Sequence, residues 1–276
     1  MIKFTKMHGL GNDFVVIDAI NQQISLSKKQ IKFLADRNFG VGCDQLLLVE
    51  KPANDNADFK YRIFNADGSE VAQCGNGARC FARFVRDKGL SDKNEIRVDT
   101  DSGQLLLTFD DDGQITVNMG IPRHSPIHIP LKTNDEALFY SVSINNTEKA
   151  FGAVSMGNPH AVIQVTDINT APVVELGETL ESHPFFPERA NIGFMQIIDR
   201  QHIKLRVYER GAAETLACGS GACAAVVIGI EQNLLDNSNI YVELPGGQLV
   251  INWSGRGQAV FMKGPAESVF EGQIQL

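Results

Sequence analysis

The chain repeats itself, and this internal repeat restricts its possible folds more than any other feature of the sequence. Cys74-Gly75-Asn76-Gly77-Ala78 matches Cys218-Gly219-Ser220-Gly221-Ala222 at a shift of 144 residues, and Glu70 falls on Glu214 at the same shift. Two more segments match in the same order: Gly11-Asn12 before residues 14–17 with Gly157-Asn158 before residues 160–163, and Gly42 and Gln45 with Gly193 and Gln196. Self-similarity of this kind indicates repeated architecture. The sequence therefore predicts a duplicated domain.

The length of the chain agrees with two medium-sized domains, because single hydrophobic cores stop growing at about 250 residues and this chain has 276. With 43% hydrophobic and 21% charged residues, the composition is typical of a globular protein. The formal net charge of -8 and the pI near 5.3 argue against nucleic acid as a partner, since nucleic-acid binders carry a clustered basic face. We expect a small-molecule ligand and neither a nucleic-acid nor a membrane partner.

Three features of the sequence favour the cytoplasm. Gly9 and Gly11 interrupt the start of the chain before any apolar run forms, so no signal peptide is expected. The most apolar stretch, residues 222–230, is too short to cross a bilayer. The five cysteines are odd in number and too sparse for a disulfide framework, so reduced thiols are expected.

Each half has several short β-rich runs and one helix directly after its Cys-Gly-x-Gly-Ala segment. The expected strands are residues 14–17, 46–49, 61–64, 105–109, 115–119, 161–165, 194–198, 203–207, 241–244, 249–253 and 260–263. The helices are predicted at residues 76–88, ending at Gly89, and at residues 222–230. The second helix is apolar on every side, so it must be buried on every side. A sheet wrapped around a central helix meets that requirement, and the halves are expected to join near Gly120-Ile121-Pro122.

The two Cys-Gly-x-Gly-Ala segments indicate the chemistry. Each places a thiol just before a helix whose first N–H groups have no partner within the helix, so those groups can hold an anion such as a carboxylate. The positive end of the helix dipole should lower the pKa of the thiol from its ordinary value of about 8.5. If the duplicated halves face each other, one thiolate can remove the α-proton of a substrate while the opposite thiol protonates the other face. The two helix starts would stabilise the carbanion, and we expect no cofactor.

Five segments resemble the diaminopimelate epimerase family, in the order in which the family has them. The most specific is Asn65-Ala66-Asp67-Gly68-Ser69 followed, after four residues, by Cys74-Gly75-Asn76-Gly77-Ala78-Arg79. The others are His8-Gly9-Leu10-Gly11-Asn12-Asp13-Phe14, Gly157-Asn158-Pro159-His160-Ala161-Val162, Asn191-Ile192-Gly193-Phe194, and the run from Glu209-Arg210-Gly211 to Cys218-Gly219-Ser220-Gly221. The resemblance spans nearly the whole chain.

The resemblance implies a cofactor-independent isomerase that interconverts LL-diaminopimelate and meso-diaminopimelate, for lysine and peptidoglycan biosynthesis, as a homodimer. It implies an α/β (mixed α+β) fold of two pseudo-symmetric domains, each a mostly antiparallel sheet or barrel wrapped around a central helix. It also implies that the last dozen residues return to the first domain, which gives domains of 1–118 plus 264–276 and 119–263.

The resemblance assigns roles by motif position. Cys74 and Cys218 are the catalytic acid/base pair, and His160 and Glu209 adjust their protonation. The residues that bind the reacting carboxylate are Gly75, Asn76, Gly219 and Ser220. The residues that bind the rest of the substrate are Asn12, Gln45, Asn65, Asn158, Asn191, Glu209 and Arg210. A guanidinium suits the distal carboxylate because it donates two parallel hydrogen bonds.

At two positions the sequence departs from the family's pattern. Ala213 stands where the family usually has glycine, and its methyl group could restrict a backbone angle, with little effect expected. Phe270 stands where some relatives have a tyrosine tied to dimer contacts, so the contribution of that hydroxyl to a dimer is absent.

Two other functions are compatible with paired cysteines. One is a proline racemase or 4-hydroxyproline epimerase, which shares the two-thiol plan but acts on a cyclic imino acid. The long motif from Asn65 to Arg79 and the guanidinium of Arg210 favour the acyclic substrate. The other is a redox protein with a reversible disulfide between Cys74 and Cys218, which no Cys-x-x-Cys motif supports.

The remaining candidate residues are expected to be structural. Cys43, Cys80 and Cys223 are predicted to be small buried hydrophobic residues without a role. His124 and His128 do not indicate a metal site, because Pro126 lies between them and no further ligand cluster appears. Residues 219–224 fit a loose dinucleotide-binding pattern, but no strand is expected to end directly before them.

Overall fold

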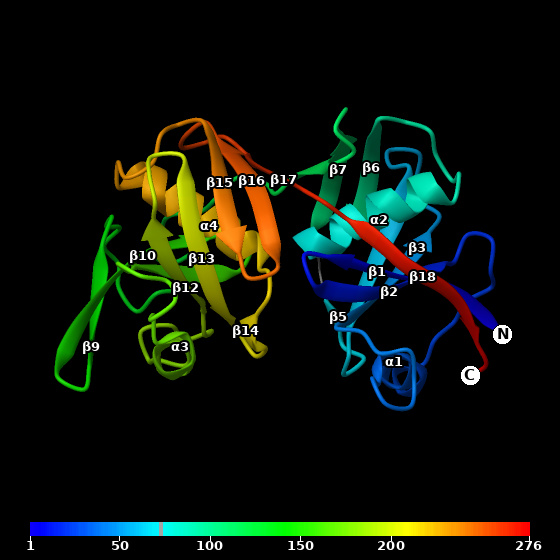
Figure 1. Cartoon of the computed structure of the whole chain (residues 1–276), viewed down its shortest axis with the longest axis horizontal. Helices are drawn as coiled ribbons and strands as arrows, with labels where there is room; N and C mark the ends of the chain where they lie inside the picture. The colour runs from blue at the N-terminus through cyan, green and yellow to red at the C-terminus, as the bar shows by residue number, and fades with distance from the viewer. Residues whose placement is uncertain (72–73) are drawn as a thin grey trace. The chain divides into compact units, whose positions relative to one another are not determined.

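The chain folds into two units. Met1–Asn118 and Lys263–Leu276 form one unit, and Met119–Met262 form the other (Figure 1). The computed structural model describes residues 1–71 and 74–276.

The first unit is a mixed sheet with two helices. Its elements are β1 (Ile2–Gly9), β2 (Asn12–Asp18), α1 (Lys28–Ala35), β3 (Gln45–Glu50), β4 (Phe59–Asn65), β5 (Glu70–Val71), α2 (Gly75–Asp87), β6 (Glu95–Thr100), β7 (Gly103–Phe109), β8 (Ile115–Asn118) and β18 (Glu267–Ile274). Strand β1 pairs antiparallel with β18 and β2, and the parallel pair β2–β3 is followed by antiparallel β3–β4. Strand β4 pairs antiparallel with the short β5 and parallel with β6, which continues through antiparallel β7 to β8.

From its second strand onward, the second unit has the same order of elements as the first. Its elements are β9 (Tyr140–Ile144), β10 (Thr147–Ser155), β11 (Pro159–Gln164), α3 (Val173–Glu181), β12 (Asn191–Ile197), β13 (His202–Glu209), β14 (Ala213–Thr215), α4 (Gly219–Glu231), β15 (Asn239–Leu244), β16 (Gly247–Trp253) and β17 (Val260–Gly264), whose last two residues belong to the first unit.

The strand pairings of the second unit repeat those of the first. Strand β10 pairs antiparallel with β9 and β11, β11 parallel with β12, and β12 antiparallel with β13. Strand β13 pairs antiparallel with β14 and parallel with β15, which pairs antiparallel with β16. Strand β9 therefore holds the place in the second unit that β18 holds in the first. The predicted duplication and the mixed α+β fold are confirmed.

Helices α2 and α4 are the central helices that the sequence predicts. Each begins directly after its cysteine, whose backbone is extended, and each runs for 13 residues. Strands surround α4 in its unit (Figure 1), and Val226, Val227 and Ile228 on it are at most 3% exposed. Full burial of such a side chain stabilises the fold by about 1.5–3 kcal/mol. A charged residue in place of Val227 would therefore be among the most damaging changes to this unit.

Within the described residues, neither these helices nor any other combines the length and apolarity that a membrane span requires.

Sequence reasoning missed helices α1 and α3. Helix α1 begins with a capping box, in which the Gln30 N–H donates to the Ser27 side chain and the Gln30 side chain accepts from the Ser27 N–H. It buries Ile31 and Leu34 against strands of its sheet. The Ser-x-x-Gln pattern at residues 27–30 was the available signal.

Ala213, at the start of β14, has a φ angle of 60°, which lies in the left-handed region that favours glycine. Ala213 therefore adopts a backbone angle that its methyl group disfavours. This angle belongs to the turn that links β13 to β14, in which Ala212 N–H donates to the Glu209 carbonyl oxygen.

Candidate active site

In both units the predicted binding residues lie at one end of three adjacent strands. In the first unit, Asn12 begins β2, Gln45 begins the parallel β3, and Asn65 ends the antiparallel β4. In the second unit, Asn158 directly precedes β11, Asn191 begins the parallel β12, and Glu209 ends the antiparallel β13. These residues lie at the same end of the strands because the first two strands run parallel and begin there, whereas the third runs antiparallel and ends there.

At the start of α2, three predicted site residues are in contact. The Cys74 Sγ donates to Asn12 Oδ1 at 3.7 Å, and Asn76 Nδ2 donates to the same oxygen at 3.4 Å. Asn76 is 3% exposed, and its Oδ1 accepts a hydrogen bond from Arg79 Nη2 at 3.0 Å. The guanidinium of Arg79 is fully buried and also donates from Nε to the Pro265 carbonyl oxygen at 3.0 Å. Arg79 therefore fixes the first turn of α2 against the returning C-terminal segment of the same unit.

Gln45 and Asn65 are directly paired across β3 and β4. Gln45 Nε2 donates to Asn65 Oδ1 at 3.0 Å, and Asn65 Nδ2 donates to Ser69 Oγ at 3.2 Å. Each amide fixes the orientation of the next, because an oxygen can only accept and an NH₂ group can only donate.

At the start of α4, Cys218 is more deeply buried than Cys74, with 4% of its surface exposed. Its Sγ accepts a hydrogen bond from Gly221 N–H at 3.3 Å and lies 3.7 Å from Ser220 Oγ. Burial raises the pKa of the Cys218 thiol well above its ordinary value, and the negative charge of Glu209 raises it further. The hydrogen bonds from Gly221 and Ser220 act in the opposite direction and are outweighed. For Cys218 the predicted lowering of the pKa by the helix start is therefore wrong.

The last glycine of each repeated motif is required for packing. A Cβ on Gly77 would lie 2.7 Å from Tyr61 Oη, which is closer than Cβ atoms approach other atoms in folded proteins. A Cβ on Gly221 would lie 3.0 Å from Val207 Cγ2, so that this neighbour would have to shift slightly. Glycine thus lets both helix starts lie directly on their sheets, with Gly75 and Gly219 as first residues.

A chain of hydrogen bonds links His160 to the start of α4. His160 Nε2 donates to Asn158 Oδ1 at 3.0 Å, and Asn158 Nδ2 donates to Ser220 Oγ at 3.3 Å. His160 is 1% exposed, and burial, with a smaller effect from the charge of Arg210, lowers the pKa of its ring to about 3. The imidazole is therefore neutral at physiological pH, and with Nε2 protonated its Nδ1 is the acceptor.

Residues 209–211 form a turn that side chains hold from two sides. Asn191 Oδ1 accepts the Arg210 backbone N–H at 3.0 Å, and Asn191 Nδ2 donates to the Pro159 carbonyl oxygen at 3.0 Å. The carboxylate of Glu181 accepts the Gly211 N–H at 3.0 Å. Asn191 is 3% exposed and binds backbone at both ends of its amide, so it holds this turn beside β11. Sequence reasoning missed Glu181, and no local pattern marks it.

Glu209 also has a partner that the sequence did not indicate. The hydroxyl of Thr215, on β14, donates to Glu209 Oε1. The Arg210 guanidinium donates from Nη1 to the Glu188 carbonyl oxygen at 3.0 Å. Both charged side chains of the turn are thus oriented by neighbours in their own unit.

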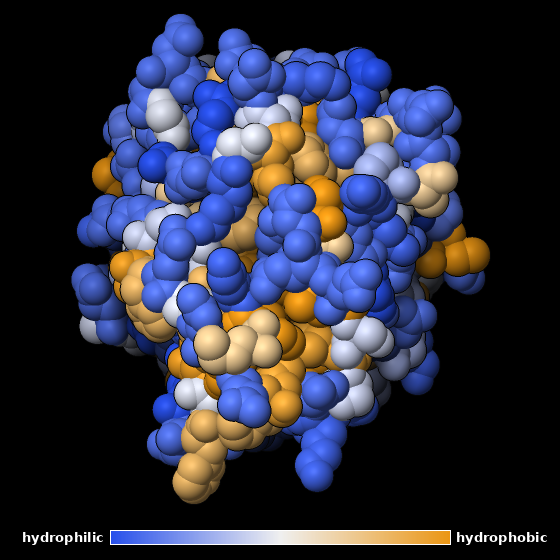
Figure 2. Space-filling view, turned by 90° about the vertical axis from the view of Figure 1, so that its right-hand side faces the viewer, coloured by the Kyte–Doolittle hydropathy of each residue, from blue (hydrophilic) through white to orange (hydrophobic). Residues whose placement is uncertain are grey.

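The other residues that the sequence singled out lie elsewhere. Phe270, on β18, is 48% exposed and packs edge-to-face on Phe4 with ring centres 6.0 Å apart. Figure 2 shows the side of the first unit that carries the chain ends in Figure 1, with apolar side chains gathered in a broken patch among hydrophilic ones.

Cys43, Cys80 and Cys223 are buried, as predicted.

His124 lies beside Glu231 in the second unit, with Nδ1 3.2 Å from Glu231 Oε2, and packs on Trp253. Among residues 1–71 and 74–276, no group of three or more His, Cys, Asp and Glu side chains is placed to hold a metal ion.

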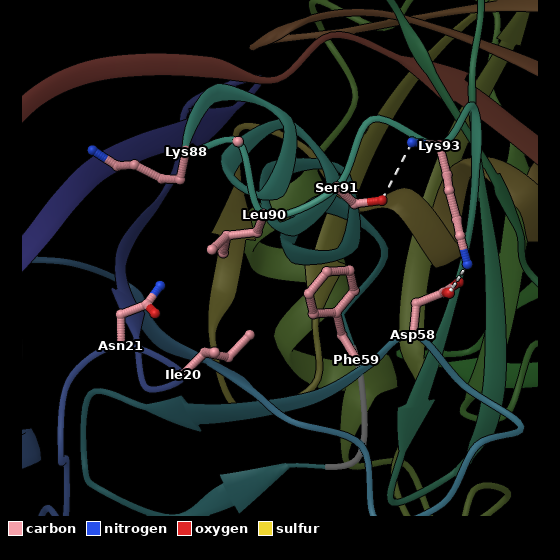
Figure 3. Close-up of a pocket in the computed structure, with 9 residues that line it drawn as sticks. Ile20, Asn21, Asp58, Phe59, Lys88, Leu90, Ser91 and Lys93 are labelled. Carbon is pink, nitrogen blue, oxygen red and sulfur yellow. Dashed lines mark hydrogen bonds and ion pairs between the residues drawn. The ribbon is translucent and has the colours of Figure 1, made fainter.

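A cavity of about 590 Å³ lies at the opposite end of α2 from Cys74 (Figure 3). Apolar Ile20, Phe59 and Leu90 line it, together with Lys93, whose ammonium pairs with Asp58 at 2.5 Å. None of the predicted site residues lines this cavity. The residues in question gather instead at the N-terminal ends of α2 and α4.

Comparisons with known proteins identify the family of the chain. The family model described as diaminopimelate epimerase matches residues 4–125 and 152–269. A diaminopimelate epimerase from Nitrosomonas europaea is 61% identical over 275 residues, covering 100% of this chain and 99% of the relative. One from Nitrosospira multiformis is 56% identical with the same coverage.

Solved structures with the same fold are far less similar in sequence. A hydroxyproline epimerase from Agrobacterium vitis superposes with a TM-score of 0.73 at 14% identity, covering 98% of this chain and 91% of that one. A phenazine biosynthesis protein of the PhzF family from Bacillus anthracis superposes with a TM-score of 0.71 at 16% identity, covering 100% and 99%. At this level of identity the likeness concerns the fold alone.

Proposed function

This chain belongs to the diaminopimelate epimerase family, and from that membership we propose that it interconverts LL-diaminopimelate and meso-diaminopimelate without a cofactor. The observation that carries the proposal is the repeated helix start. In each unit a cysteine is the residue directly before a buried helix. Asn12 and Asn76 are in contact at the first of these helix starts, and Ser220 lies beside Cys218 at the second.

The proposed reaction needs one acid and one base on opposite faces of the α-carbon. In one direction the thiolate of one cysteine, Cys74 or Cys218, takes the α-proton, and the thiol of the other donates a proton to the planar carbanion. The proton count is conserved, since each turnover moves one proton onto one sulfur and one off the other. The reverse reaction exchanges the two roles.

The carbanion is stabilised where its charge accumulates, on the carboxylate. We infer that the first N–H groups of α2 and α4, from Gly75-Asn76 and Gly219-Ser220, donate to its oxygens. These donors are fixed by the helices before substrate arrives, so no reorganisation is required during proton transfer.

The distal, unreacting end of the substrate carries an ammonium and a carboxylate. The Arg210 guanidinium can bind that carboxylate through two parallel hydrogen bonds. The carboxylate of Glu209 can accept from the ammonium, and Asn12, Gln45, Asn65 and Asn158 complete the proposed site. Asn191 contributes by holding Arg210, because both ends of its amide already bind backbone.

His160 is suited to adjust cysteine protonation as a neutral acceptor. Its low pKa keeps the ring uncharged, so it can accept a proton from a thiol only weakly and can orient one through Nδ1. Burial and the carboxylate of Glu209 favour the protonated form of Cys218, the form in which it donates a proton in one direction of the reaction.

The proposal is tested by incubating purified protein, with no added cofactor, with LL-diaminopimelate in deuterated water. We expect the meso isomer to form and to carry one α-deuterium, measured by chiral chromatography and mass spectrometry. The same incubation with L-proline and trans-4-hydroxy-L-proline tests the alternative substrate class. Deuterium that enters only these cyclic imino acids would overturn the assignment.

Two further properties follow from the proposal. Both cysteines must remain thiols for proton transfer, and a reducing compartment maintains them, so we place the enzyme in the cytoplasm. We also propose a homodimer through β18, whose apolar residues Val269 and Phe270 are 56% and 48% exposed on a strand that pairs only with β1 among the pairings described. Sedimentation of the wild type and of Phe270→Asp tests the dimer.

A further inference from the structure

Two equivalent asparagines are turned in opposite directions. Asn12 and Asn158 occupy matching places in the repeat, and each precedes in sequence the helix that follows the cysteine of its unit. Asn12 directs its oxygen toward the start of α2, where Oδ1 accepts from Cys74 Sγ at 3.7 Å and from Asn76 Nδ2 at 3.4 Å. Asn158 directs its nitrogen toward the start of α4, where Nδ2 donates to Ser220 Oγ at 3.3 Å. The duplicated site therefore offers an acceptor beside one cysteine and a donor beside the other.

The partner of each amide on the far side decides its direction. Asn158 presents Nδ2 to the helix, and its Oδ1 lies 3.0 Å from His160 Nε2, a pairing that the imidazole tautomer protonated on Nε2 satisfies. Asn12 must present Oδ1 because its Nδ2 donates to the carboxylate of Asp44 at 3.0 Å, and a carboxylate can only accept. If Asn12 turned over, its oxygen would face the oxygens of Asp44 without a proton between them.

Asp44 is itself fixed on three sides. Its Oδ2 also accepts the Asp13 backbone N–H at 3.2 Å, and its Oδ1 accepts from Arg37 Nη2 at 2.7 Å. Its own N–H donates to Asp13 Oδ1 at 2.9 Å. The Arg37 guanidinium in turn binds both oxygens of Asp13. The carboxylate of Asp44 therefore cannot rotate away from Asn12 without breaking its bonds to the Asp13 N–H and to Arg37.

We propose that Asp44, clamped by Arg37, is a positioning residue that fixes the amide of Asn12 with its oxygen toward Cys74. An acceptor beside a thiol stabilises the protonated form, because only S–H can donate to it. Asp44 thereby favours the protonated form of Cys74 through an amide oxygen. The start of α4 lacks this contact because Asn158 presents its nitrogen there, so the two helix starts are chemically unequal although their backbones repeat. This inference rests on the proposed acid/base role of Cys74.

The test compares the wild type with Asp44→Ala, Asn12→Ala and the double variant. The readout is the pH dependence of alkylation by iodoacetamide at Cys74, followed by mass spectrometry of the peptide that contains it. Cys74 is suited to this reagent because Cys43, Cys80, Cys218 and Cys223 are each at most 4% exposed.

We expect Asp44→Ala to lower the pH midpoint of Cys74 alkylation by about 0.5–1 pH unit, the effect of one hydrogen bond. Without the Asn12 amide, Asp44 has no group to position. The double variant should therefore have the same pH midpoint of alkylation as Asn12→Ala alone. Epimerisation by Asp44→Ala should fall about tenfold in kcat, with less change in KM. Asp112→Asn, which loses an exposed contact to Lys263, is the control expected to leave both readouts unchanged.

An unchanged midpoint in Asp44→Ala, or the same shift with and without Asn12, would overturn the inference. If Asp44→Ala does not fold, as judged by circular dichroism, Arg37→Gln replaces it, because that change frees the carboxylate without removing it. A smaller shift in the same direction is then expected, and no shift counts against the proposal. The alkylation readout does not require turnover, so a failure of the proposed function is seen separately, as wild-type protein that does not epimerise.

Discussion

Arg206 holds Glu214 through two parallel hydrogen bonds, from Nε at 2.6 Å and from Nη2 at 2.9 Å. In the first unit Arg62 holds Glu70 through the same two atoms at the same distances. Both pairs join the strand before the site, β13 or β4, to the short strand that leads to the cysteine helix. The duplication has therefore kept this clamp between adjacent strands, while the amides of Asn12 and Asn158 point in opposite directions.

Replacing Arg206 by leucine should destabilise the protein by about 1–2 kcal/mol, because a bidentate, partly buried pair is stronger than an exposed one. Arg206 also donates from Nη1 to the Ile168 carbonyl oxygen, which would lose its partner. Urea unfolding measures the effect. Arg83→Leu is the matched control, since its pair with Asp87 lies on an exposed helix face and should contribute about 0.3–0.5 kcal/mol. Equal losses from the two variants would contradict the clamp.

Replacing Ala213 by glycine should stabilise the protein by about 0.5–1 kcal/mol. The φ of 60° costs an L-residue about 1–2 kcal/mol, which glycine does not lose. The greater freedom of glycine in the unfolded chain offsets about 0.4–1 kcal/mol of this stabilisation. Ala212→Gly is the control, because φ of Ala212 is not positive, and it should destabilise. Both are measured by urea unfolding, and a loss of stability in Ala213→Gly would show that the turn is not strained there.

The repeat and the two central helices could be predicted because they leave local marks in the sequence. The paired Cys-Gly-x-Gly-Ala segments give the duplication directly, and the continuous apolar run of α4 requires burial on all sides. Strands with apolar alternation, such as β16, were also predictable. Strand β18 was not, because its first five residues are all exposed and only pairing with β1 makes it a strand.

The site was predictable by residue type and motif, but its internal contacts were not. Asp44 precedes Gln45 in sequence, yet its importance lies in a bond to Asn12, which is 32 residues away and on a neighbouring strand. Likewise, the sequence indicated that a helix start would lower the pKa of Cys218. Burial and the charge of Glu209 have the larger effect, and both depend on the tertiary fold.

Acid should destabilise the protein partly through His160. The folded ring has a pKa of about 3, whereas the unfolded ring has its ordinary value of about 6.5, so below pH 6.5 the unfolded chain gains a proton that the folded chain does not. The stability contributed by neutral His160 is thus complete above pH 6.5 and is lost as pH falls toward 3. Glutamine in place of His160 can still donate to Asn158 but does not titrate. Across that window the unfolding free energy of His160→Gln should therefore fall by up to about 1.4 kcal/mol less per pH unit than that of the wild type. Parallel curves of unfolding free energy against pH for the two proteins would show that His160 does not stay buried and neutral.

Mild oxidation should inactivate the enzyme reversibly. The proposed mechanism brings Cys74 and Cys218 to one carbon. Hydrogen peroxide can oxidise two thiols at such a short distance to a disulfide, with two molecules of water formed. We expect activity to fall with peroxide and to return with dithiothreitol, while Cys43, Cys80 and Cys223, which are buried, remain thiols. Mass spectrometry identifies the cross-link. Full activity in protein that carries it would contradict the proposal that both cysteines act on one substrate carbon.

Single substitutions at the two cysteines separate a two-base mechanism from a one-base mechanism. Cys74→Ala and Cys218→Ala should each lower the rate of epimerisation by at least about 10²–10⁴-fold, because each variant lacks the acid or the base of one direction. Cys43→Ala, in the core of the first unit, should retain turnover. The sharper result comes from α-proton exchange in deuterated water. A variant with one thiol can still remove the proton on its own face, so Cys74→Ala should exchange the α-hydrogen of one isomer and Cys218→Ala that of the other, both without inversion. If either variant inverts the centre while exchanging it, a single group serves both faces, and the two helix starts cannot be the opposed acid and base.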